Sequence, residues 1–361
     1  MRMETEKRDI IIFTDGMGNC GIQRVLSELT ESWIRKGHKI LIVYNKKIDA
    51  GLSDYSWSDK IEFIEISVKN NAFSIYYKLF RSYLRLLNDR PAATAVSLSV
   101  MTNFVIGACA PFVNNRIVIS DRNDPDKRPR GKIKQFIRNQ AFKQADVLIL
   151  QTDYVQKYYE KKIHKKGIVI PNPISRMLPP IKKCPTRRPV IVTAGRLNKQ
   201  KNLTMLIKAF FKLVTDYPEY ELEIYGRGEE EENLKSLVKD LDIADNVSFK
   251  GFSKNLYNDI IDSSIYVCSS DYEGISNSVL EALGLGIPVI STDCPVGGSR
   301  LLIEHEVNGI LVNVGDVDAL YMQMKRLIDD PRLCEKLSGN AIKVREKYNV
   351  DRIAQLWIDS M

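Results

Sequence analysis

The sequence predicts an α/β protein made of two doubly wound, Rossmann-like domains that face a central cleft. Its 361 residues are about twice the usual length of one domain. Short apolar runs typical of strands alternate with amphipathic helical stretches along the chain. A proline-rich segment interrupts that alternation once. In such folds ligands bind beyond the carboxyl ends of the strands, so the functional residues are expected in the loops that follow strands.

In the first half, the expected strands cover residues 9–14, 39–44, 61–66, 94–98, 116–120, 146–150 and 167–171. Their almost continuous apolar character is typical of parallel strands that are buried on both faces. The uncharged run at 91–115 is long enough to span a membrane. Because serine, threonine, asparagine and proline interrupt it, a buried strand followed by a buried helix explains it better.

In the second half, the expected strands cover residues 190–195, 222–226, 246–251, 265–270 and 288–292. Six prolines at 171–189 disfavour both helix and central strand. We therefore expect an N-terminal domain at 1–172, a linker at 173–189 and a C-terminal domain at 190–345. The last segment, 346–361, is expected to be a helix that can cross back to the first domain.

Charge is distributed unevenly. The net charge is +8, with +12 in residues 1–180 and −4 in the remainder, and residues 127–143 hold seven basic residues and no acidic one. A strongly basic first half suggests that this half binds an anionic partner. A solvated helix face explains the basic stretch equally well. A nucleic-acid-binding protein would need a recognisable binding motif, and we find none.

Cysteine and histidine usage argues against metal and disulfide frameworks. The six cysteines form no CxxC pair and the three histidines are scattered, which fits a reducing compartment. The start of the sequence lacks the layout of a signal peptide. We therefore expect a cytoplasmic protein.

The loop after the first strand contains Gly16, Gly18 and Gly21 before a long helix. Glycines there let the backbone approach a ligand, and a helix N-terminus favours phosphate, although tight packing alone would also explain them. The same glycines match a dinucleotide-binding pattern. That pattern needs an acidic residue after the second strand. The sequence has Asn45, Lys46 and Lys47 there instead, which weakens an NAD interpretation.

Two loops of the second half carry the charges that a nucleotide sugar would need. Arg196 follows a strand and Lys201 comes five residues later, so two cations at a strand-to-helix junction suit a diphosphate. Glu273 precedes Gly274, and Glu281 lies one turn or so into the helix expected at about 277–285, which Ser276 or Asn277 can cap. Carboxylates at both ends with helix N–H groups between them would suit hydroxyls and phosphate, respectively.

Together these loops resemble the retaining glycosyltransferases of family 4, which have the GT-B fold, over nearly the whole chain. The stretch "EGISNSVLE" is similar to the E-x7-E motif of that family, and "AGRLNKQKN" is similar to its G-R-L…K segment. The N-terminal "NCGIQRVLSELTESWIRKGHKI" and the C-terminal "CPVGGSRLLIEHEVNGILV" also match family segments.

The resemblance implies a donor-binding C-terminal domain and an acceptor-binding N-terminal domain. Glu273 would hold hydroxyls of the donor sugar, Glu281 the ribose, and Arg196 and Lys201 the diphosphate. Further donor contacts would come from glycines and backbone N–H groups, namely Gly18, Gly21, Gly251, Gly274, Ile275, Ser276, Asn277 and Ser278. No cofactor and no metal ion is expected, since the two cations take over the electrostatic role of a metal. The two Asp-x-Asp patterns, at Asp124–Asp126 and Asp316–Asp318, are attributed to chance.

The chain departs from the family pattern at three positions. Cys20 stands where glycine is frequent, and Gln23 where glutamate is frequent. Arg122 occupies the place of a histidine that many members have near the donor sugar. By position alone Arg122 remains a candidate catalytic residue beside Glu273, Arg196 and Lys201.

The acceptor is expected to be a glycan linked to a lipid diphosphate, in surface polysaccharide assembly. Lys78, Arg81 and Arg85 fall on one face of an aromatic-rich helix that could lie on an anionic membrane or pack into the domain. Peripheral binding to the inner face of the cell membrane is favoured. The donor is expected to be a UDP-sugar carrying a hexose or N-acetylhexosamine. The alternatives are a nucleotide-sugar epimerase of the same fold and a non-catalytic nucleotide-sugar-binding subunit.

Overall fold

The computed structural model describes residues 8–18, 21–45, 55, 57–67, 72–165, 167–181 and 187–361. It divides into two compact units, the first ending at Pro173 and including Val350–Met361, and the second comprising Ile174–Asn349. The boundary falls at the start of the predicted linker. Cys20, Lys46 and Lys47 lie outside the described residues, and so do residues 182–186 of the predicted linker.

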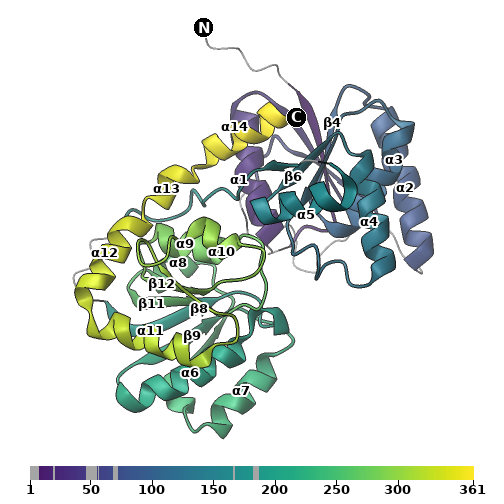
Figure 1. Ribbon diagram of the computed structural model, residues 1–361. Coiled ribbons are helices and arrows are strands. Elements are labelled where there is room, and N and C mark those ends of the chain that lie inside the picture. The colour runs from purple at the N-terminus through teal and green to yellow at the C-terminus, as the bar shows by residue number, and fades with distance from the viewer. Residues whose placement is uncertain are drawn as a thin grey trace. The chain divides into compact units, whose positions relative to one another are not determined.

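The first unit contains a sheet of parallel strands in the order β3-β2-β1-β4-β5-β6-β7 among the described residues (Figure 1). The strands are β1 (Asp9–Thr14), β2 (Lys39–Tyr44), β3 (Glu62–Glu65), β4 (Thr94–Ser97), β5 (Ile117–Asp121), β6 (Val147–Leu150) and β7 (Ile168–Val169). The helices are α1 (Gly21–Arg35), α2 (Ala72–Asn88), α3 (Val100–Cys109), α4 (Lys132–Gln144), α5 (Asp153–Ile163) and α14 (Val350–Ser360), with a short 3₁₀ helix η1 (Ala110–Phe112).

Alternating side chains of β1 pack against helices on opposite faces of the first sheet. Ile10 and Ile12 pack in one cluster with α1 and α14, where Trp33 Nε1 of α1 donates a hydrogen bond of 3.0 Å to Ala354 O. On the other face the ring of Phe13 lies 4.4 Å from that of Tyr83 on α2. The C-terminal helix α14 therefore completes the core of the first unit.

The second unit repeats the plan with the parallel order β10-β9-β8-β11-β12-β13. Its strands are β8 (Arg188–Ala194), β9 (Glu221–Tyr225), β10 (Val247–Gly251), β11 (Ser263–Cys268), β12 (Val289–Thr292) and β13 (Ile310–Val312). Its α-helices are α6 (Leu203–Asp216), α7 (Glu231–Asp240), α8 (Leu256–Ile260), α9 (Asn277–Gly284), α10 (Gly298–Leu302), α11 (Val317–Asp329), α12 (Pro331–Ala341) and α13 (Val344–Lys347). The short 3₁₀ helices are η2 (Lys199–Lys201) and η3 (Ala244–Asn246).

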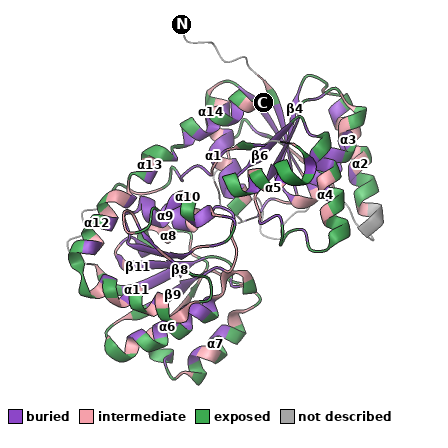
Figure 2. Ribbon diagram, in the orientation of Figure 1, coloured by how far each residue is buried: buried purple, intermediate pink, exposed green. Residues whose placement is uncertain are grey.

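The structure confirms the predicted fold class. Every predicted strand is present with ends that agree to within two residues, and β13 is a strand that the sequence interpretation missed. Figure 2 shows the central strands of both units as buried and the helices as half-exposed, as expected for doubly wound sheets. The run at 91–115 forms the buried strand β4 and the largely buried helix α3. Among the described residues no helix has the length and apolarity to cross a membrane.

Candidate donor-binding site

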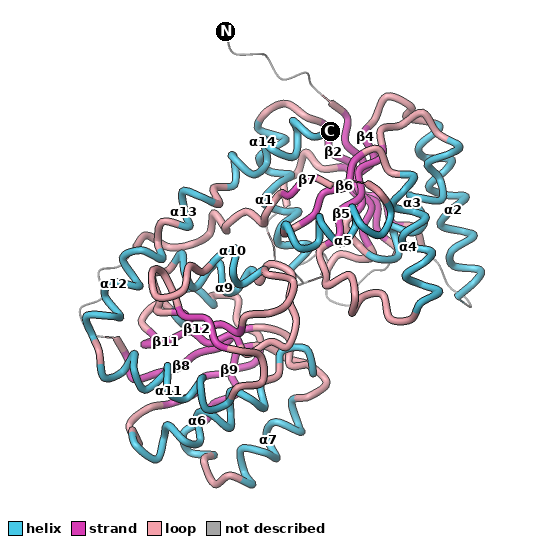
Figure 3. Tube along the Cα trace, viewed as in Figure 1, coloured by secondary structure: helices cyan, strands magenta, loops and turns pink. Residues whose placement is uncertain are grey.

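Lys201 and Glu273, two residues predicted for the donor, lie where the strand order of the second sheet reverses. Strand β8 is central, with β9 on one side and β11 on the other (Figure 3). In doubly wound sheets this switch point, at the carboxyl ends of the strands, is where ligands bind. Two segments follow these strands there, which we name the β8 loop (residues 195–202) and the β11 loop (residues 269–276).

Hydrogen bonds tie the β8 loop to the β11 loop. The Ser269 hydroxyl donates to Lys201 O at 2.9 Å, and the Asp271 N–H donates to Gln200 O at 2.9 Å. In return, the Gln200 side chain donates to Tyr272 O at 2.9 Å. Because the bonds run in both directions, the two loops form one rigid support for the side chains that they carry.

Lys201 and Glu273 form an ion pair on this support. Lys201 Nζ lies 2.6 Å from Glu273 Oε1, and the two side chains are only 19% and 13% exposed. Ser270 Oγ also donates to Glu273 Oε1, at 3.0 Å. Burial disfavours the charged lysine, but the Glu273 carboxylate outweighs that effect and raises the pKa of Lys201. Lys201 is therefore held as a cation at neutral pH, and a phosphate could replace Glu273 as its partner.

The backbone around the pair is packed so closely that only glycine fits. A Cβ on Gly226, at the end of β9, would lie 1.8 Å from Gly195 O, and a Cβ on Gly228 would lie 2.1 Å from Leu197 O. Gly195 itself leaves room for the Lys201 side chain, since a Cβ there would lie 3.0 Å from Lys201 Cε. The sequence interpretation missed Gly226 and Gly228, although a Gly-x-Gly pair after a strand is a readable signal.

The other predicted donor residues of the second unit lie at the ends of strands, in the β11 loop and on α9. Arg196 is exposed at the end of β8, Glu281 is buried on α9, and Gly251 ends β10 with a positive φ of 66°. The N-terminal turn of α9 follows the β11 loop directly, and the Ser276 side chain makes no capping hydrogen bond to it. The predicted backbone contacts run from the end of the β11 loop into this turn, namely Gly274, Ile275, Ser276, Asn277 and Ser278. Cations, helix N–H groups and carboxylates at this switch point can together hold an anionic, hydroxyl-rich ligand.

In the first unit, the predicted N-terminal loop also lies at a switch point, between β1 and β4. Gly18 is buried in this loop, and Gly21 is the first residue of α1. Gln23 Nε2 donates to Thr14 Oγ1 at 3.0 Å and to Gly16 O at 2.5 Å, so the glutamine holds the loop against the end of β1. This is a structural use for the residue that replaces the glutamate of the family pattern.

Arg122 lies among interior groups of the first unit. Its Nη2 donates to Asn172 Oδ1, which also accepts a 2.7 Å bond from Gln151, and its guanidinium carbon lies 6.0 Å from the centre of the Trp357 ring. Burial, together with the neighbouring Arg24, lowers the pKa of Arg122 to about 9. Arg122 can thus anchor Asn172, just before the unit boundary. Its contact with a sugar stays a prediction.

Asp15, directly after β1, is a candidate that the sequence interpretation did not single out. Its Oδ1 is buried and has no hydrogen-bond partner among the described residues. Burial raises the pKa of Asp15 to about 6, against the opposing effect of the Thr102 and Met101 N–H groups at the start of α3. A carboxyl group with a pKa near neutrality can hold or release a proton during a reaction.

Asp15→Asn is expected to stabilise the first unit at neutral pH. The folded-state pKa exceeds the ordinary aspartate value of 3.8, so the stability that Asp15 contributes falls as the pH rises from about 4 to about 6. Asparagine carries no charge and should raise the free energy of unfolding at pH 7.5 by about 1–2 kcal/mol, a gain that vanishes near pH 4. Urea unfolding followed by tryptophan fluorescence measures this unit, because Trp33, Trp57 and Trp357 all belong to it.

The matched control for this prediction is Asp59→Asn, which changes an exposed carboxylate of the same unit. No pH-dependent gain is expected from it. A variant D15N that is less stable than the wild type at both pH values would contradict the burial argument.

The Asp-x-Asp patterns have local structural partners. Asp124 Oδ1 accepts the N–H of Asp126 at 2.9 Å, and Asp316 caps α11 by accepting the N–H of Ala319 at 2.9 Å. Asp318 pairs with Lys212. Within the described part of the chain, no three histidine, cysteine or acidic side chains gather in a group that could hold a metal ion.

Comparison with known proteins connects this geometry to an enzyme class. Residues 177–344 match the family model described as "Glycosyl transferases group 1". An uncharacterized glycosyltransferase of Haemophilus influenzae is 31% identical over 59% of this chain. The chain spans 60%, 51% and 28% of the length of the first three curated relatives that it matches.

Two further proteins resemble the chain over almost its full length. The N-acetylgalactosamine-N,N'-diacetylbacillosaminyl-diphospho-undecaprenol 4-alpha-N-acetylgalactosaminyltransferase of Campylobacter jejuni is 26% identical over 93% of this chain and 94% of its own. The pneumococcal O-GlcNAc transferase GtfA, solved with UDP and GlcNAc, superposes with a TM-score of 0.79 at 14% identity, covering 98% of both chains. The second likeness extends to both units. The chain therefore has the GT-B fold, and its residues 177–344 are similar to the group 1 glycosyl transferases.

Proposed function

We propose that the chain transfers a hexose or N-acetylhexosamine from a UDP-sugar, with retention of configuration, to a glycan acceptor linked to a lipid diphosphate. The observation that carries the proposal is the pairing of Lys201 with Glu273 on two hydrogen-bonded loops at the switch point of the second sheet. This arrangement supplies a cation for a departing diphosphate beside a carboxylate for sugar hydroxyls. The proposed setting is the assembly of surface polysaccharide or another glycan.

In the proposed reaction, an acceptor oxygen bonds to the anomeric carbon while the bond between that carbon and the phosphate oxygen breaks. The departing phosphate takes the proton of the acceptor hydroxyl on the same face of the sugar. Arg196 and Lys201 stabilise the charge that develops on the diphosphate, so no metal ion is required. Glu273 orients the sugar by accepting hydrogen bonds from its hydroxyls, and Glu281 binds the ribose.

Three lines of support favour the donor and the acceptor in this proposal. The GtfA structure contains UDP and GlcNAc, and GtfA resembles this chain over both units. The name of the Campylobacter relative describes transfer of an N-acetylhexosamine to an undecaprenol diphosphate glycan. The resemblance to family 4 implies retention.

Calorimetric titration with UDP, GDP and ADP in the presence of EDTA tests the donor site. We expect UDP to bind most tightly without metal, and Arg196→Ala to weaken UDP binding by about tenfold through loss of a charge-assisted hydrogen bond. The matched control is Arg332→Ala, which removes an exposed arginine on α12. If no diphosphate binds, the non-catalytic subunit becomes the better interpretation. If UDP binds, and the sugar of a UDP-sugar is altered without being transferred, the epimerase becomes the better interpretation.

A further inference from the structure

Helix α4 of the first unit buries an arginine and exposes three large apolar side chains. Ile133 is 77% exposed, Phe136 is 61% exposed and Ile137 is 46% exposed. Arg138, by contrast, is buried along with Ala141 and Phe142. A helix that serves only its own domain places its apolar stripe against the core. The outward apolar residues of α4 therefore do not contribute to the core of this unit.

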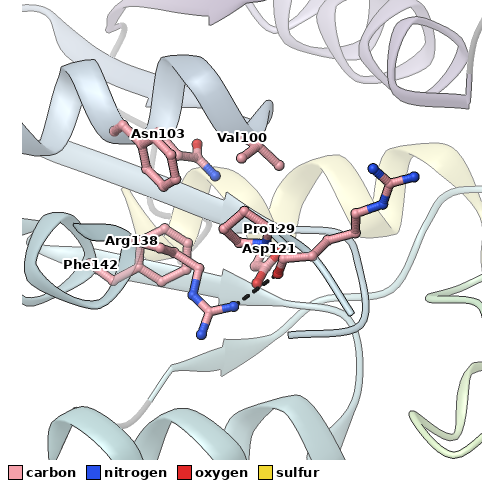
Figure 4. Close-up of a pocket in the computed structure, with 8 residues that line it drawn as sticks. Val100, Asn103, Asp121, Pro129, Arg138 and Phe142 are labelled. Atoms are coloured by element: carbon pink, nitrogen blue, oxygen red, sulfur yellow. Dashed lines mark hydrogen bonds between the residues drawn. The ribbon is translucent and has the colours of Figure 1, made fainter. Parts of the chain in front are cut away.

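The inward arginine has a structural reason. Figure 4 shows Arg138 and Phe142 directed toward Asp121 and Pro129 around a small pocket. Arg138 Nη1 donates to Pro125 O at 2.6 Å and to Arg128 O at 2.9 Å, which holds the loop between β5 and α4 in place. Because the buried Arg138 fixes the rotation of α4 about its axis, Ile133, Phe136 and Ile137 are left facing outward.

Basic side chains surround the exposed apolar residues of α4. Arg130, Lys132 and Lys134 are exposed next to Ile133, and no acidic residue occurs between Lys127 and Ala145. We name Ile133, Phe136 and Ile137 with these three cations the α4 outer face. Apolar side chains flanked by charges of one sign are typical of helices that lie in the interface of an anionic membrane.

Neighbouring elements extend this surface with further exposed aromatic and basic side chains. Helix α3 packs against both α2 and α4, so all three helices lie in one layer of the first unit (Figure 1). Besides Phe136, the exposed aromatic residues of this layer include Tyr76 and Tyr77 on α2 and Phe112 on η1. The predicted basic residues of α2, Lys78, Arg81 and Arg85, are all exposed. Aromatic and basic side chains of this kind sit at the level of lipid headgroups.

We propose that the α4 outer face docks the first unit onto an anionic lipid membrane, with Ile133, Phe136 and Ile137 entering the interface and the cations contacting headgroups. A protein partner would need an acidic, concave surface of its own, whereas an anionic bilayer matches both the projecting apolar residues and the single sign of charge. This docking would bring the enzyme to an acceptor carried on lipid. It does not depend on the identity of the donor.

Flotation with phosphatidylcholine vesicles, with and without phosphatidylglycerol, tests the proposal on the full chain. We expect binding only to the anionic vesicles and weaker binding at high salt. The charge variant K132E/K134E should weaken it by about tenfold or more, and the apolar variant I133S/F136S/I137S by a similar factor.

The controls change the same chemistry on the second unit. R332E/K336E makes an identical change of net charge on α12, and F211S/M322S removes exposed apolar residues from α6 and α11. Both controls should bind vesicles as the wild type does. All variants should retain wild-type affinity for UDP, so a failure of docking is distinguishable from a failure of the donor site.

Two results would overturn docking through the α4 outer face. One is that the wild-type protein does not bind anionic vesicles, or that the control variants lose vesicle binding as much as the α4 variants do. The other is concentration-dependent self-association, seen by light scattering, that I133S/F136S/I137S abolishes without affecting vesicle binding. The second result would mean that another copy of the chain covers this face.

Discussion

Replacing Glu273 by glutamine is expected to lower the rate of sugar transfer by about 10²–10⁴-fold while leaving UDP affinity unchanged or slightly higher. The carboxylate accepts from Ser270 and pairs with Lys201 at 2.6 Å. Glutamine can keep the bond from Ser270, but it carries no charge. Lys201 then loses its competing carboxylate and becomes more available to the diphosphate, whereas the sugar loses a charged hydrogen-bond acceptor.

The structure adds a stability cost to this prediction. Removing one partner leaves the largely buried Lys201 without its ion pair, which should lower the free energy of unfolding by about 1–3 kcal/mol. Transfer from UDP-sugars, UDP calorimetry and thermal unfolding together separate the two effects.

A matched control comes from Glu223 on β9, whose side chain is 5% exposed and pairs with Arg188 and Lys250 at 3.3 Å each. Glu223→Gln removes a buried, paired charge from the same sheet but away from the β8 and β11 loops. The Glu223→Gln variant should have a lower free energy of unfolding but no specific loss in the rate of sugar transfer. If E273Q transfers sugar as well as E223Q does, and R196A also binds UDP normally, the site assignment is wrong.

Replacing Gly298 by alanine is expected to displace the β11 loop. A Cβ at this position would lie 1.7 Å from Gly274 O, and its next neighbour is the carbonyl carbon of the same residue at 2.5 Å. Backbone atoms cannot rotate away as a flexible side chain would, so the loop that carries Glu273 has to move. We expect a loss of about 2–4 kcal/mol in the free energy of unfolding and a fall in transfer of more than about 100-fold.

The control for this variant is Gly315→Ala. Gly315 has a φ of +79°, but a Cβ added there would have no described atom within 4 Å, so alanine meets conformational strain without a clash. Gly315→Ala should lower the free energy of unfolding by about 1 kcal/mol and leave the rate of sugar transfer unchanged. Urea unfolding and transfer assays on both variants make the comparison, and equal effects of G298A and G315A would show that the close approach to Gly274 does not matter.

The sequence determined the features that depend on local pattern. Apolar runs and intervening helical periodicity predicted the alternating strands and helices, and β8 and β11 end where the pattern placed them, to within two residues. The glycines and charged residues after those strands marked the loops of the site for the same reason. Strand β13 covers only Ile310–Val312, and the sequence interpretation assigned no strand there.

Only the tertiary structure decided which distant groups meet. The strand order brings the β8 loop next to the β11 loop, and this places Lys201 against Glu273 although the sequence suggested separate roles for them. Likewise, no local pattern shows that Arg138 is buried, because its partners are carbonyl groups of a loop that folds over it. Local periodicity encodes which face of a helix is apolar. The partners that a polar side chain finds depend on contacts between segments far apart in the chain, and those contacts decided the ion pair of the site and the outward side of α4.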